Sequence, residues 1–321
     1  MSFTAAFDVL DPGLQATIQD RGRRDVAKMG LSPSGFADWL SARAANRLVG
    51  NPQGAALIET TLTGFAFTAR HAMRIAVTGA PSKLTVSGGE REMWRSMRVR
   101  AGADVKLGPA QSGLRCYIAF QGGVMAPPIF GSLSTDLTAN LGGFEGRALA
   151  RGDRVALGAL DRDPNDRDLA MTAQARPHWR QPATLRATRG PHAARFSAED
   201  FAFFQNQAYR VSPRSSRQGV RLEGHGLQRS SGFDVASCGV CAGCVQLSSD
   251  GLPIVLLAEH QSTGGYAIPM VVISADTPDA AQVRPGDEVR FRIVGQPEAA
   301  TALTEKTRAL TEKLHHADTP D

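Results

Sequence analysis

The sequence predicts a mainly β fold with a few helices (α+β), arranged as two β-rich subdomains. Short apolar runs rich in β-branched residues recur along the chain between turn signals, which is typical of many short strands. The 33 glycines and 18 prolines among 321 residues suit tight turns. Residues 161–182 (DRDPNDRDLAMTAQARPHWRQP) are polar, bounded by prolines and without apolar periodicity. We therefore expect subdomains at 1–160 and 185–296, a linker or surface excursion at 161–184, and a C-terminal helical tail at 297–321.

The composition argues against two classes of partner. The net charge of +5 comes mostly from scattered arginines, and aromatic residues make up only 6% of the chain. This pattern disfavours nucleic-acid binding, because single strands need aromatic side chains interleaved with basic ones. Small anionic ligands remain compatible with it. No window approaches the roughly 18 to 20 apolar residues of a membrane span, and the N-terminus lacks a secretory signal. We expect a cytoplasmic protein.

The first subdomain should contain one helix among strands. Residues 7–19 begin as a strand that a turn at Asp11-Pro12-Gly13 interrupts. Residues 38–51 (DWLSARAANRLVGN) carry apolar side chains at helical spacing, and Gly50-Asn51-Pro52 stops the helix. The strand rhythm then resumes in ALIETTL, FAFTA, MRIAVTGA and KLTVSGG, from residue 56 to residue 89.

One turn pattern occurs three times. An arginine and a Gly-Asp-like turn precede an alternating strand at 99–107 (VRAGADVKL), 149–157 (LARGDRVAL) and 283–291 (VRPGDEVRF). A turn fixed by glycine and aspartate before an alternating strand is common in β-meanders and barrels. Its presence in both halves indicates two related β units.

The second subdomain should contain a helix at about 197–207, with Ser197 as its cap and acidic residues in the first turn. A terminal helix is expected at 301–316 (TALTEKTRALTEKLHH). Between them, two apolar runs, PIVLLA and MVVISAD, read as buried strands that flank a polar segment at 259–266 (EHQSTGGY).

That polar segment is the candidate functional site. Gln261, Ser262, Thr263 and Tyr266 offer an amide, two hydroxyls and a phenol, and paired glycines let the backbone come close to a ligand. The alternative is a hairpin turn whose polar groups only satisfy the backbone, since Gly-Gly turns are common. The segment alone leaves both interpretations open.

Seven stretches carry a family resemblance, and they occur in family order along most of the chain. They are PGLQATIQDR at 12–21, SGFAD at 34–38, ANRLVGN at 45–51, AVTGA at 76–80, GSLSTDLTANLGGF at 131–144, GVRLEG at 219–224 and QSTGGY at 261–266. The chain resembles the biotin-dependent carboxyltransferase family, subdomains A and B, also called allophanate hydrolase subunit 2. That family includes the C subunit of 5-oxoprolinase and the sporulation-kinase-inhibitor antagonist protein.

The resemblance implies a second subdomain similar to a cyclophilin-like β-barrel and a partner that carries subdomains C and D. A third subunit is also compatible with it. It implies an enzyme subunit that is inactive alone and acts on a small amide. The reaction would be ATP-dependent opening of 5-oxoproline to glutamate, with ATP used by the complex, or carboxyl transfer to urea or a related amide from biotin carried by another protein. The alternative is a non-catalytic regulatory protein that sequesters the partner.

Amide chemistry builds negative charge on an oxygen, which requires hydrogen-bond donors aimed at it. We assign catalytic roles to Gln261, Thr263 and Tyr266, and substrate-binding roles to Ser262 and to the backbone at Gly264 and Gly265.

Ser34 and Gly35, ahead of a helix N-terminus, and Arg217 are further substrate-binding candidates. Structural alternatives are a helix cap for Ser34 and a surface ion pair for Arg217. For Ser132 and Asp136 we favour a purely structural role.

The chain departs from the family pattern near these residues. The family usually has Asp-Arg where this chain has Glu259-His260, Asp where it has Ser216, and Pro-Lys where it has Ala267-Ile268. These differences leave the substrate open.

Cys238, Cys241 and Cys244 form a C-x-x-C-x-x-C pattern, and Cys116 falls in an apparent buried strand. Zinc takes four ligands and iron–sulfur clusters usually four thiolates; His225 or His260 could complete a set, but the spacing places neither. We expect no metal and interpret these cysteines as small apolar core residues. A P-loop motif is absent from the sequence, so ATP would bind here without one or would bind a partner.

Overall fold

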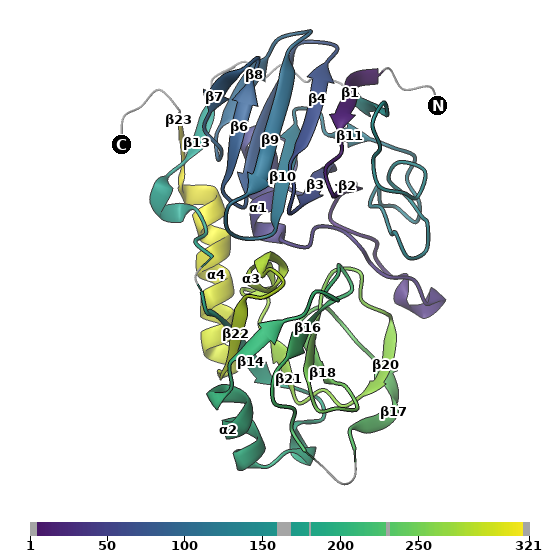
Figure 1. The fold of residues 1–321 in the computed structure, drawn as a ribbon, viewed down its shortest axis with the longest axis vertical. Helices are drawn as coiled ribbons and strands as arrows, with labels where there is room; N and C mark the ends of the chain where they lie inside the picture. The colour runs from purple at the N-terminus through teal and green to yellow at the C-terminus, as the bar shows by residue number, and fades with distance from the viewer. Residues whose placement is uncertain (1–4, 159–167, 180, 229–231, 317–321) are drawn as a thin grey trace. The chain divides into compact units, whose positions relative to one another are not determined.

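A computed structural model describes residues 5–158, 168–179, 181–228 and 232–316 (Figure 1). The chain divides into two compact units that are discontinuous in sequence. The first unit comprises Met1–Arg24, Ser34–His178 and Arg308–Asp321, and the second comprises residues 25–33 and 179–307. The subdomains expected from the sequence are continuous, unlike these units. Part of the expected linker, at 161–167 and 180, lies outside the described residues, and another part forms a strand, β13 (Leu169–Met171).

The first unit consists mainly of two antiparallel sheets, as the mainly β prediction requires. The seven-stranded sheet has the order β11-β12-β1-β4-β9-β6-β7, and the five-stranded sheet has the order β2-β3-β10-β5-β8. The strands of the larger sheet are β1 (Ala5–Asp11), β4 (Phe65–Ala69), β6 (Ser82–Val86), β7 (Gly89–Arg91), β9 (Asp104–Ala110), β11 (Val124–Met125) and β12 (Arg154–Leu157). Those of the smaller sheet are β2 (Gln15–Gln19), β3 (Leu57–Thr61), β5 (Met73–Gly79), β8 (Ser96–Val99) and β10 (Arg115–Phe120).

Aromatic rings join the two sheets in a common core. The ring of Phe7 on β1 stacks on that of Phe120 on β10, with centroids 4.8 Å apart and an interplanar angle of 13°. Phe67 on β4 packs against both rings, with centroids 4.9 Å from Phe7 and 5.4 Å from Phe120. All three side chains are fully buried. Alternation along each strand places these rings on the inner faces.

Helix α1 (Trp39–Leu48) covers the smaller sheet and confirms the predicted helix. Its Ala42, Ala45 and Leu48 share a buried cluster with Leu57 of β3 and Tyr117 of β10. Gly50 follows the helix with φ of 77°, a left-handed conformation that suits glycine and ends the helix.

The three repeated turns form as the sequence predicted. Gly102, Gly152 and Gly286 all adopt positive φ, at 77°, 89° and 91°. Each turn leads into a strand, namely β9, β12 and β22 (Glu288–Ile293). The Asp287 carboxylate accepts a hydrogen bond from the Arg284 amide at 2.8 Å, which fixes the third turn.

The second unit contains a closed seven-stranded barrel, with the order β14-β21-β18-β19-β16-β15-β22. Its remaining strands are β14 (Ala183–Arg189), β15 (Tyr209–Val211), β16 (Gly219–Glu223), β18 (Cys244–Leu247), β19 (Pro253–Leu256) and β21 (Met270–Val272). A parallel pairing between β14 and β22 closes the ring, whereas the other neighbours are antiparallel.

Three helices accompany the barrel. Helix α2 (Ala198–Asn206) has Ser197 as its N-cap, as predicted, and Asp200 completes a capping box with it. Helix α3 (Thr277–Gln282) was not anticipated. Helix α4 (Gln296–Glu312) packs Ala299 and Ala302 against barrel residues Ile273 and Val294.

The prediction of a helix over 301–316 is wrong at its end. Residues Leu314–His316 form β23, which pairs with β13 in the first unit. Helix α4 is the longest helix in the described part of the chain, and no helix there is long and apolar enough to cross a membrane.

Candidate functional site

The polar segment at 261–266 ends in a strand and is not a hairpin turn. Residues Thr263–Tyr266 form β20, which pairs with β17 (Asp234–Gly239) to make a two-stranded sheet. Both strands are seen side by side in Figure 1. The flanking runs become β19 and β21, as expected for buried strands, but each pairs with β18 and they do not pair with each other. The hairpin alternative is therefore wrong, because 13 residues separate these strands and a third strand lies between them.

The polar side chains of the segment lie at the surface of the second unit. Gln261, Thr263 and Tyr266 are exposed, whereas Ser262, Gly264 and Gly265 are half-buried. The structure thus places six of the predicted site residues in one continuous segment, with four on β20 and Gln261 and Ser262 just before it. Thr263 and Gly264 are held in register by their pairing with Gly239 and Cys238.

The side chain of Gln261 is held by a residue that the sequence analysis did not select. Its Nε2 donates a hydrogen bond to Oε1 of Gln246 at 3.0 Å. Gln246 lies on β18, whose four residues are all buried, and its side chain is 2% exposed. A glutamine inside a fully buried strand was the available signal, because buried polar groups normally have a specific partner.

Gln246 leaves its side-chain amide nitrogen without a partner. Its Nε2 is buried and has no hydrogen-bond partner among the described residues. A Cβ added to Gly264 would lie only 2.3 Å from this nitrogen, so the absence of a side chain at Gly264 makes room for the Gln246 amide. The amides of Gln246 and Gln261 therefore form one packed arrangement with Gly264.

His260 lies beside this arrangement in a neutral form. Burial lowers the pKa of its imidazole below the usual 6.5, although a hydrogen bond with the Gln261 carbonyl partly opposes this. Its Nδ1 lies 2.7 Å from that carbonyl oxygen, so the neutral ring carries its proton on Nδ1. The contact ties the imidazole to the backbone of Gln261.

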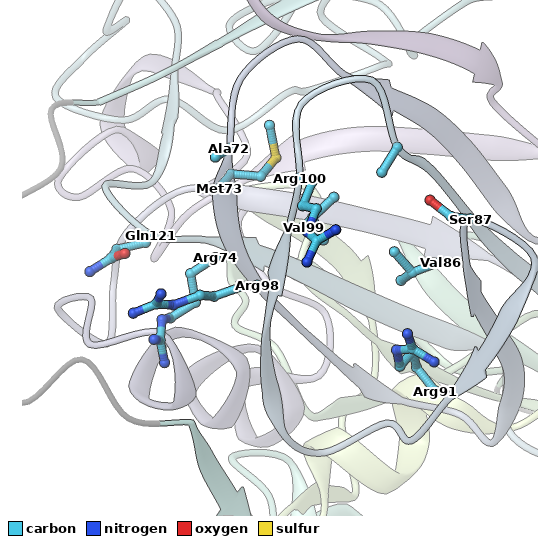
Figure 2. Close-up of a pocket in the computed structure, with 11 residues that line it drawn as sticks. Ala72, Met73, Arg74, Val86, Ser87, Arg91, Arg98, Val99, Arg100 and Gln121 are labelled. Atoms are coloured by element: carbon cyan, nitrogen blue, oxygen red, sulfur yellow. The ribbon is translucent and has the colours of Figure 1, made fainter.

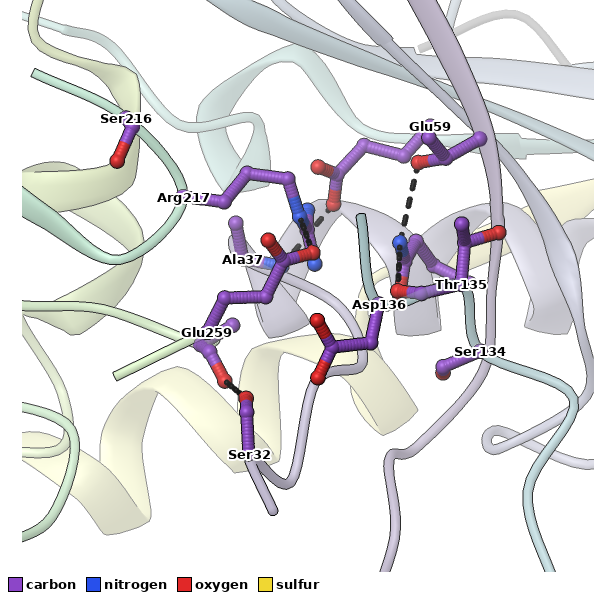
Figure 3. Close-up of polar contacts among 12 residues, drawn as sticks. Ser32, Ala37, Glu59, Ser134, Thr135, Asp136, Ser216, Arg217 and Glu259 are labelled. Carbon is purple, nitrogen blue, oxygen red and sulfur yellow. Dashed lines mark hydrogen bonds and ion pairs between the residues drawn. The ribbon is translucent and has the colours of Figure 1, made fainter. Parts of the chain in front are cut away.

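Arg217 is engaged in a buried ion pair with Glu259 (Figure 3). Its Nε lies 2.6 Å from Oε1 of Glu259, and the two side chains are 3% and 4% exposed. Backbone bonds keep the partners together, since the Glu259 amide donates to the Arg217 carbonyl at 2.9 Å. The ion pair foreseen for Arg217 exists, but it is buried and not at the surface. Ser216, just before it, is exposed and caps the Gln218 amide at 3.1 Å.

Ser34 and Gly35 belong to the first unit. Ser34 does not cap the helix: the N-cap of α1 is Asp38, whose carboxylate accepts from the Ser41 amide at 3.0 Å and the Ser41 hydroxyl at 2.6 Å. Ser34 itself is buried with φ of 53°. Gly35 donates its N–H to the Gln19 side chain at 3.1 Å.

Ser132 and Asp136 have structural roles, in line with the interpretation favoured from the sequence. The hydroxyl of Ser132 donates to Asp20 at 2.6 Å, and that of Ser134 donates to the same oxygen at 2.6 Å. Asp136 accepts hydrogen bonds from the amides of Thr138 and Ala139, both at 3.0 Å. These carboxylates organise loops of the first unit.

A separate cavity of about 820 Å³ lies in the first unit and is lined by four arginines (Figure 2). Arg74 and Arg98 are direct neighbours across β5 and β8, and no carboxylate is among the described lining residues. Arg74 is paired with Asp168 at 2.9 Å, and Arg98 and Arg100 are exposed. The buried arginine of this cavity is already paired and the other arginines are exposed, so the cavity is not a preformed anion-binding site.

The three clustered cysteines do not all fit the apolar-core interpretation. Cys244 is buried and Cys238 packs against the same apolar cluster, but Cys241 is exposed. In the described part of the chain no three His, Cys, Asp or Glu side chains gather so that they could hold a metal ion. Cys116 is buried on β10, as expected.

Chemically, the Gln261 segment offers neutral donors on a firmly held strand. A side-chain amide carries two N–H donors, and Gln261 uses one of them on Gln246, which leaves one for a ligand oxygen. The hydroxyls of Thr263 and Tyr266 add exposed donors on β20, three residues apart and therefore on opposite faces of the strand. This set suits the carbonyl oxygen of an amide better than a phosphate, which requires cations.

Comparisons with known proteins identify the family. The chain is 33% identical to the C subunit of 5-oxoprolinase from Escherichia coli (strain K12) over 313 residues, covering 96% of this chain and 98% of the relative. The solved structure of TTHA0988 matches with a TM-score of 0.82 and 34% identity, covering 91% of this chain, which spans only 56% of that one. The K. lactis urea amidolyase matches with a TM-score of 0.88 and 27% identity, covering all of this chain and 20% of that one. The family described as carboxyltransferase domain, subdomain A and B, matches residues 29–293, and the chain belongs to this family.

Proposed function

We propose that this chain is a subunit of an ATP-dependent 5-oxoprolinase, which opens the cyclic amide 5-oxoproline to glutamate. The observation that carries the proposal is the end-to-end similarity to the C subunit of the Escherichia coli 5-oxoprolinase, which covers 98% of that relative. The second candidate is the subdomain A/B part of a biotin-dependent carboxyltransferase acting on urea. It is favoured by the TM-score of 0.88 against the K. lactis urea amidolyase.

Both functions require help for a carbonyl oxygen that gains negative charge. The remaining N–H of Gln261 would donate to that oxygen, and Gln246 would keep the amide oriented. A donor of this kind contributes most when its position is fixed before the reaction. Thr263 and Tyr266 would bind the other polar atoms of the substrate, with Ser262, Gly264 and Gly265 shaping the strand.

The implied cofactors suit these residues to different degrees. ATP would supply the free energy for ring opening, but a triphosphate does not fit the neutral groups around Gln261, and Arg217 is occupied by Glu259. We therefore assign ATP to a partner subunit. The ureido carbonyl of a biotin carried by another protein does fit neutral amide donors, and bound biotin would deliver a carboxyl group.

The proposal includes a heteromer. The partner would carry subdomains C and D, a third subunit would complete the enzyme, the complex would work in the cytoplasm, and the chain alone would be inactive. The barrel of the second unit would be the cyclophilin-like subdomain. The relatives named above are enzymes or enzyme subunits, so the rival hypothesis of a non-catalytic sequestering protein is not favoured.

The test is reconstitution of this chain with the partner subunits that the proposal requires. Release of glutamate and ADP from 5-oxoproline and ATP is measured for the complex and for each subunit alone. In a second assay, carboxylation of urea by the complex is measured with bicarbonate, ATP and a biotinylated carrier. We expect glutamate only from the full complex. Carboxylation of urea without glutamate release would support the second candidate. A stable complex that catalyses neither reaction would overturn both.

A further inference from the structure

Two of the clustered cysteines lie in direct contact at the start of β18. The Sγ atoms of Cys241 and Cys244 are 3.6 Å apart. The two residues are the ends of a four-residue turn, Cys241-Ala242-Gly243-Cys244, closed by a hydrogen bond from the Cys244 amide to the Cys241 carbonyl at 3.1 Å. The ends of such a turn lie within about 7 Å, close to the Cα separation that a disulfide spans.

The turn is firmly built around Gly243. This residue has φ of 89°, and a Cβ there would lie 2.6 Å from the carbonyl oxygen of Val272. Its N–H donates to Leu256 and its carbonyl accepts from Val272, both at 2.8 Å. The backbone bonds to β19 and β21 therefore hold both cysteines at the same rim of the barrel, and only glycine fits between them.

The two thiols differ in accessibility and in pKa, as the attacking and resolving thiols of a redox-active pair do. Cys241 is exposed, so a small molecule can reach it, whereas Cys244 is buried directly behind it. A hydrogen bond from Cys244 lowers the pKa of Cys241 to about 6, and that same bond together with burial raises the pKa of Cys244. At neutral pH the accessible sulfur is the thiolate and the sheltered sulfur keeps its proton.

We propose that Cys241 and Cys244 are a redox-active dithiol that closes reversibly to a disulfide by exchange with a small-molecule disulfide. The Cys241 thiolate attacks one sulfur of the oxidant, forms a mixed disulfide and expels the other half as a thiolate. Cys244 gives up its proton to that departing thiolate, and its sulfur then attacks Sγ of Cys241. The second half of the oxidant leaves as a thiolate and takes up from water the proton that Cys241 released on ionising, so overall the protein loses two hydrogens and the oxidant becomes two thiols.

Formation of this disulfide would affect the candidate site through strand β18. The sulfurs must move from 3.6 Å to about 2.05 Å, which pulls on the first residue of β18. Cys244 and Gln246 are two residues apart on that strand and so point to the same side. Gln246 in turn holds Gln261, so oxidation is expected to disturb the position of the Gln261 amide.

The test compares single variants under oxidised glutathione. The protein is incubated with it, remaining thiols are alkylated, and peptides are mapped by mass spectrometry. We expect a 241–244 disulfide, with a mass loss of about 2 Da that dithiothreitol reverses. Cys244→Ala should stop at a stable glutathione adduct on Cys241, Cys241→Ser should give neither product, and Cys238→Ala should behave like the parent.

A second measurement does not depend on oxidation or on enzyme activity. At pH 6 a thiol of pKa near 6 is about half ionised, whereas an ordinary thiol is ionised to about 0.3%. A thiolate of low pKa is intrinsically less nucleophilic, which offsets part of this difference. Alkylation of Cys241 should therefore be roughly ten times faster than alkylation of an ordinary thiol. Alkylation of Cys241 at the ordinary rate, or a parent protein that accumulates only the glutathione adduct, would overturn the proposal.

Discussion

The guanidinium Nε of Arg217 lies 2.6 Å from the carboxylate Oε1 of Glu259, and both side chains are almost entirely shielded from water. Charged groups are removed from water only at a high cost, so each partner depends on the other. The backbone hydrogen bond between the same two residues fixes their approach. The pair therefore anchors the chain immediately before His260 and Gln261.

Removing one partner should destabilise the protein strongly. We expect Glu259→Ala to lower the free energy of unfolding by about 3–5 kcal/mol, because it removes the carboxylate that lies 2.6 Å from a buried guanidinium. The double variant Arg217→Met/Glu259→Leu should recover most of this loss. Urea unfolding measures both. As a control, Glu312→Gln at the exposed Arg308–Glu312 pair should cost less than about 1 kcal/mol. Equal effects at the two pairs would contradict the role assigned to Arg217.

The two glycines of β20 should respond differently to a methyl group. In Gly264→Ala the new Cβ would lie 2.3 Å from Nε2 of Gln246, whereas in Gly265→Ala the nearest atom is the Val235 carbonyl oxygen at 3.5 Å. We expect the first variant to lose about 1–3 kcal/mol of stability and the second less than about 1 kcal/mol. Adding Gln246→Ala should relieve the Gly264→Ala variant. If Gly264→Ala and Gly265→Ala unfold at the same urea concentration, the proposed packing of Gln246 is wrong.

Gln261→Ala should affect turnover far more than stability. The lost donor to a developing oxyanion would cost about 2.7–4 kcal/mol, or a roughly 100- to 1,000-fold lower kcat, in the reconstituted complex. The melting temperature and partner binding should stay close to the parent, since the side chain is exposed. The matched control is Gln111→Ala, an exposed glutamine of the first unit, which should keep full turnover. Unchanged turnover in Gln261→Ala would remove Gln261 from the site.

His260 should make stability depend on pH in the acidic range. Its folded-state pKa lies below the usual 6.5, so the unfolded chain binds the proton more readily. Stability from this residue is complete above about pH 6.5 and is lost as the pH falls through the folded-state pKa. Urea unfolding between pH 5 and pH 8 should therefore show a shallower decline for His260→Asn than for the parent. His225→Asn, at an exposed histidine, should retain the parent slope, and an unaltered slope in His260→Asn would refute the assignment.

Features fixed by neighbouring residues were predictable from the sequence. The start of α2 at Ser197 and the positive φ at Gly102, Gly152 and Gly286 follow from local capping and turn chemistry. The mainly β class followed from apolar runs of strand length, and the closed barrel matches what the family resemblance implied. The family resemblance also held, because its motifs depend on residue order and not on geometry.

Features fixed by distant pairing were not predictable. The β20 segment TGGY has no apolar alternation, and it becomes a strand because β17, about 25 residues earlier, supplies the partner. The last residues of the expected terminal helix become β23 because they pair with β13. Gln246 was missed for the same reason, since its contact with Gln261 joins a barrel strand to a segment 15 residues further along the chain. These contacts outweigh local propensity.

The split of the first unit along the sequence has a consequence during synthesis. Strand β13 is translated before every strand of the barrel, whereas its partner β23, at residues 314–316, is translated after all of them. The barrel likewise cannot close until β22 has been synthesised, because β22 is the parallel neighbour of β14. Contacts between such distant segments form slowly, because a long loop must close first. A nascent chain stalled before residue 314 therefore carries an unpaired β13 edge, the kind of edge that invites pairing with other chains.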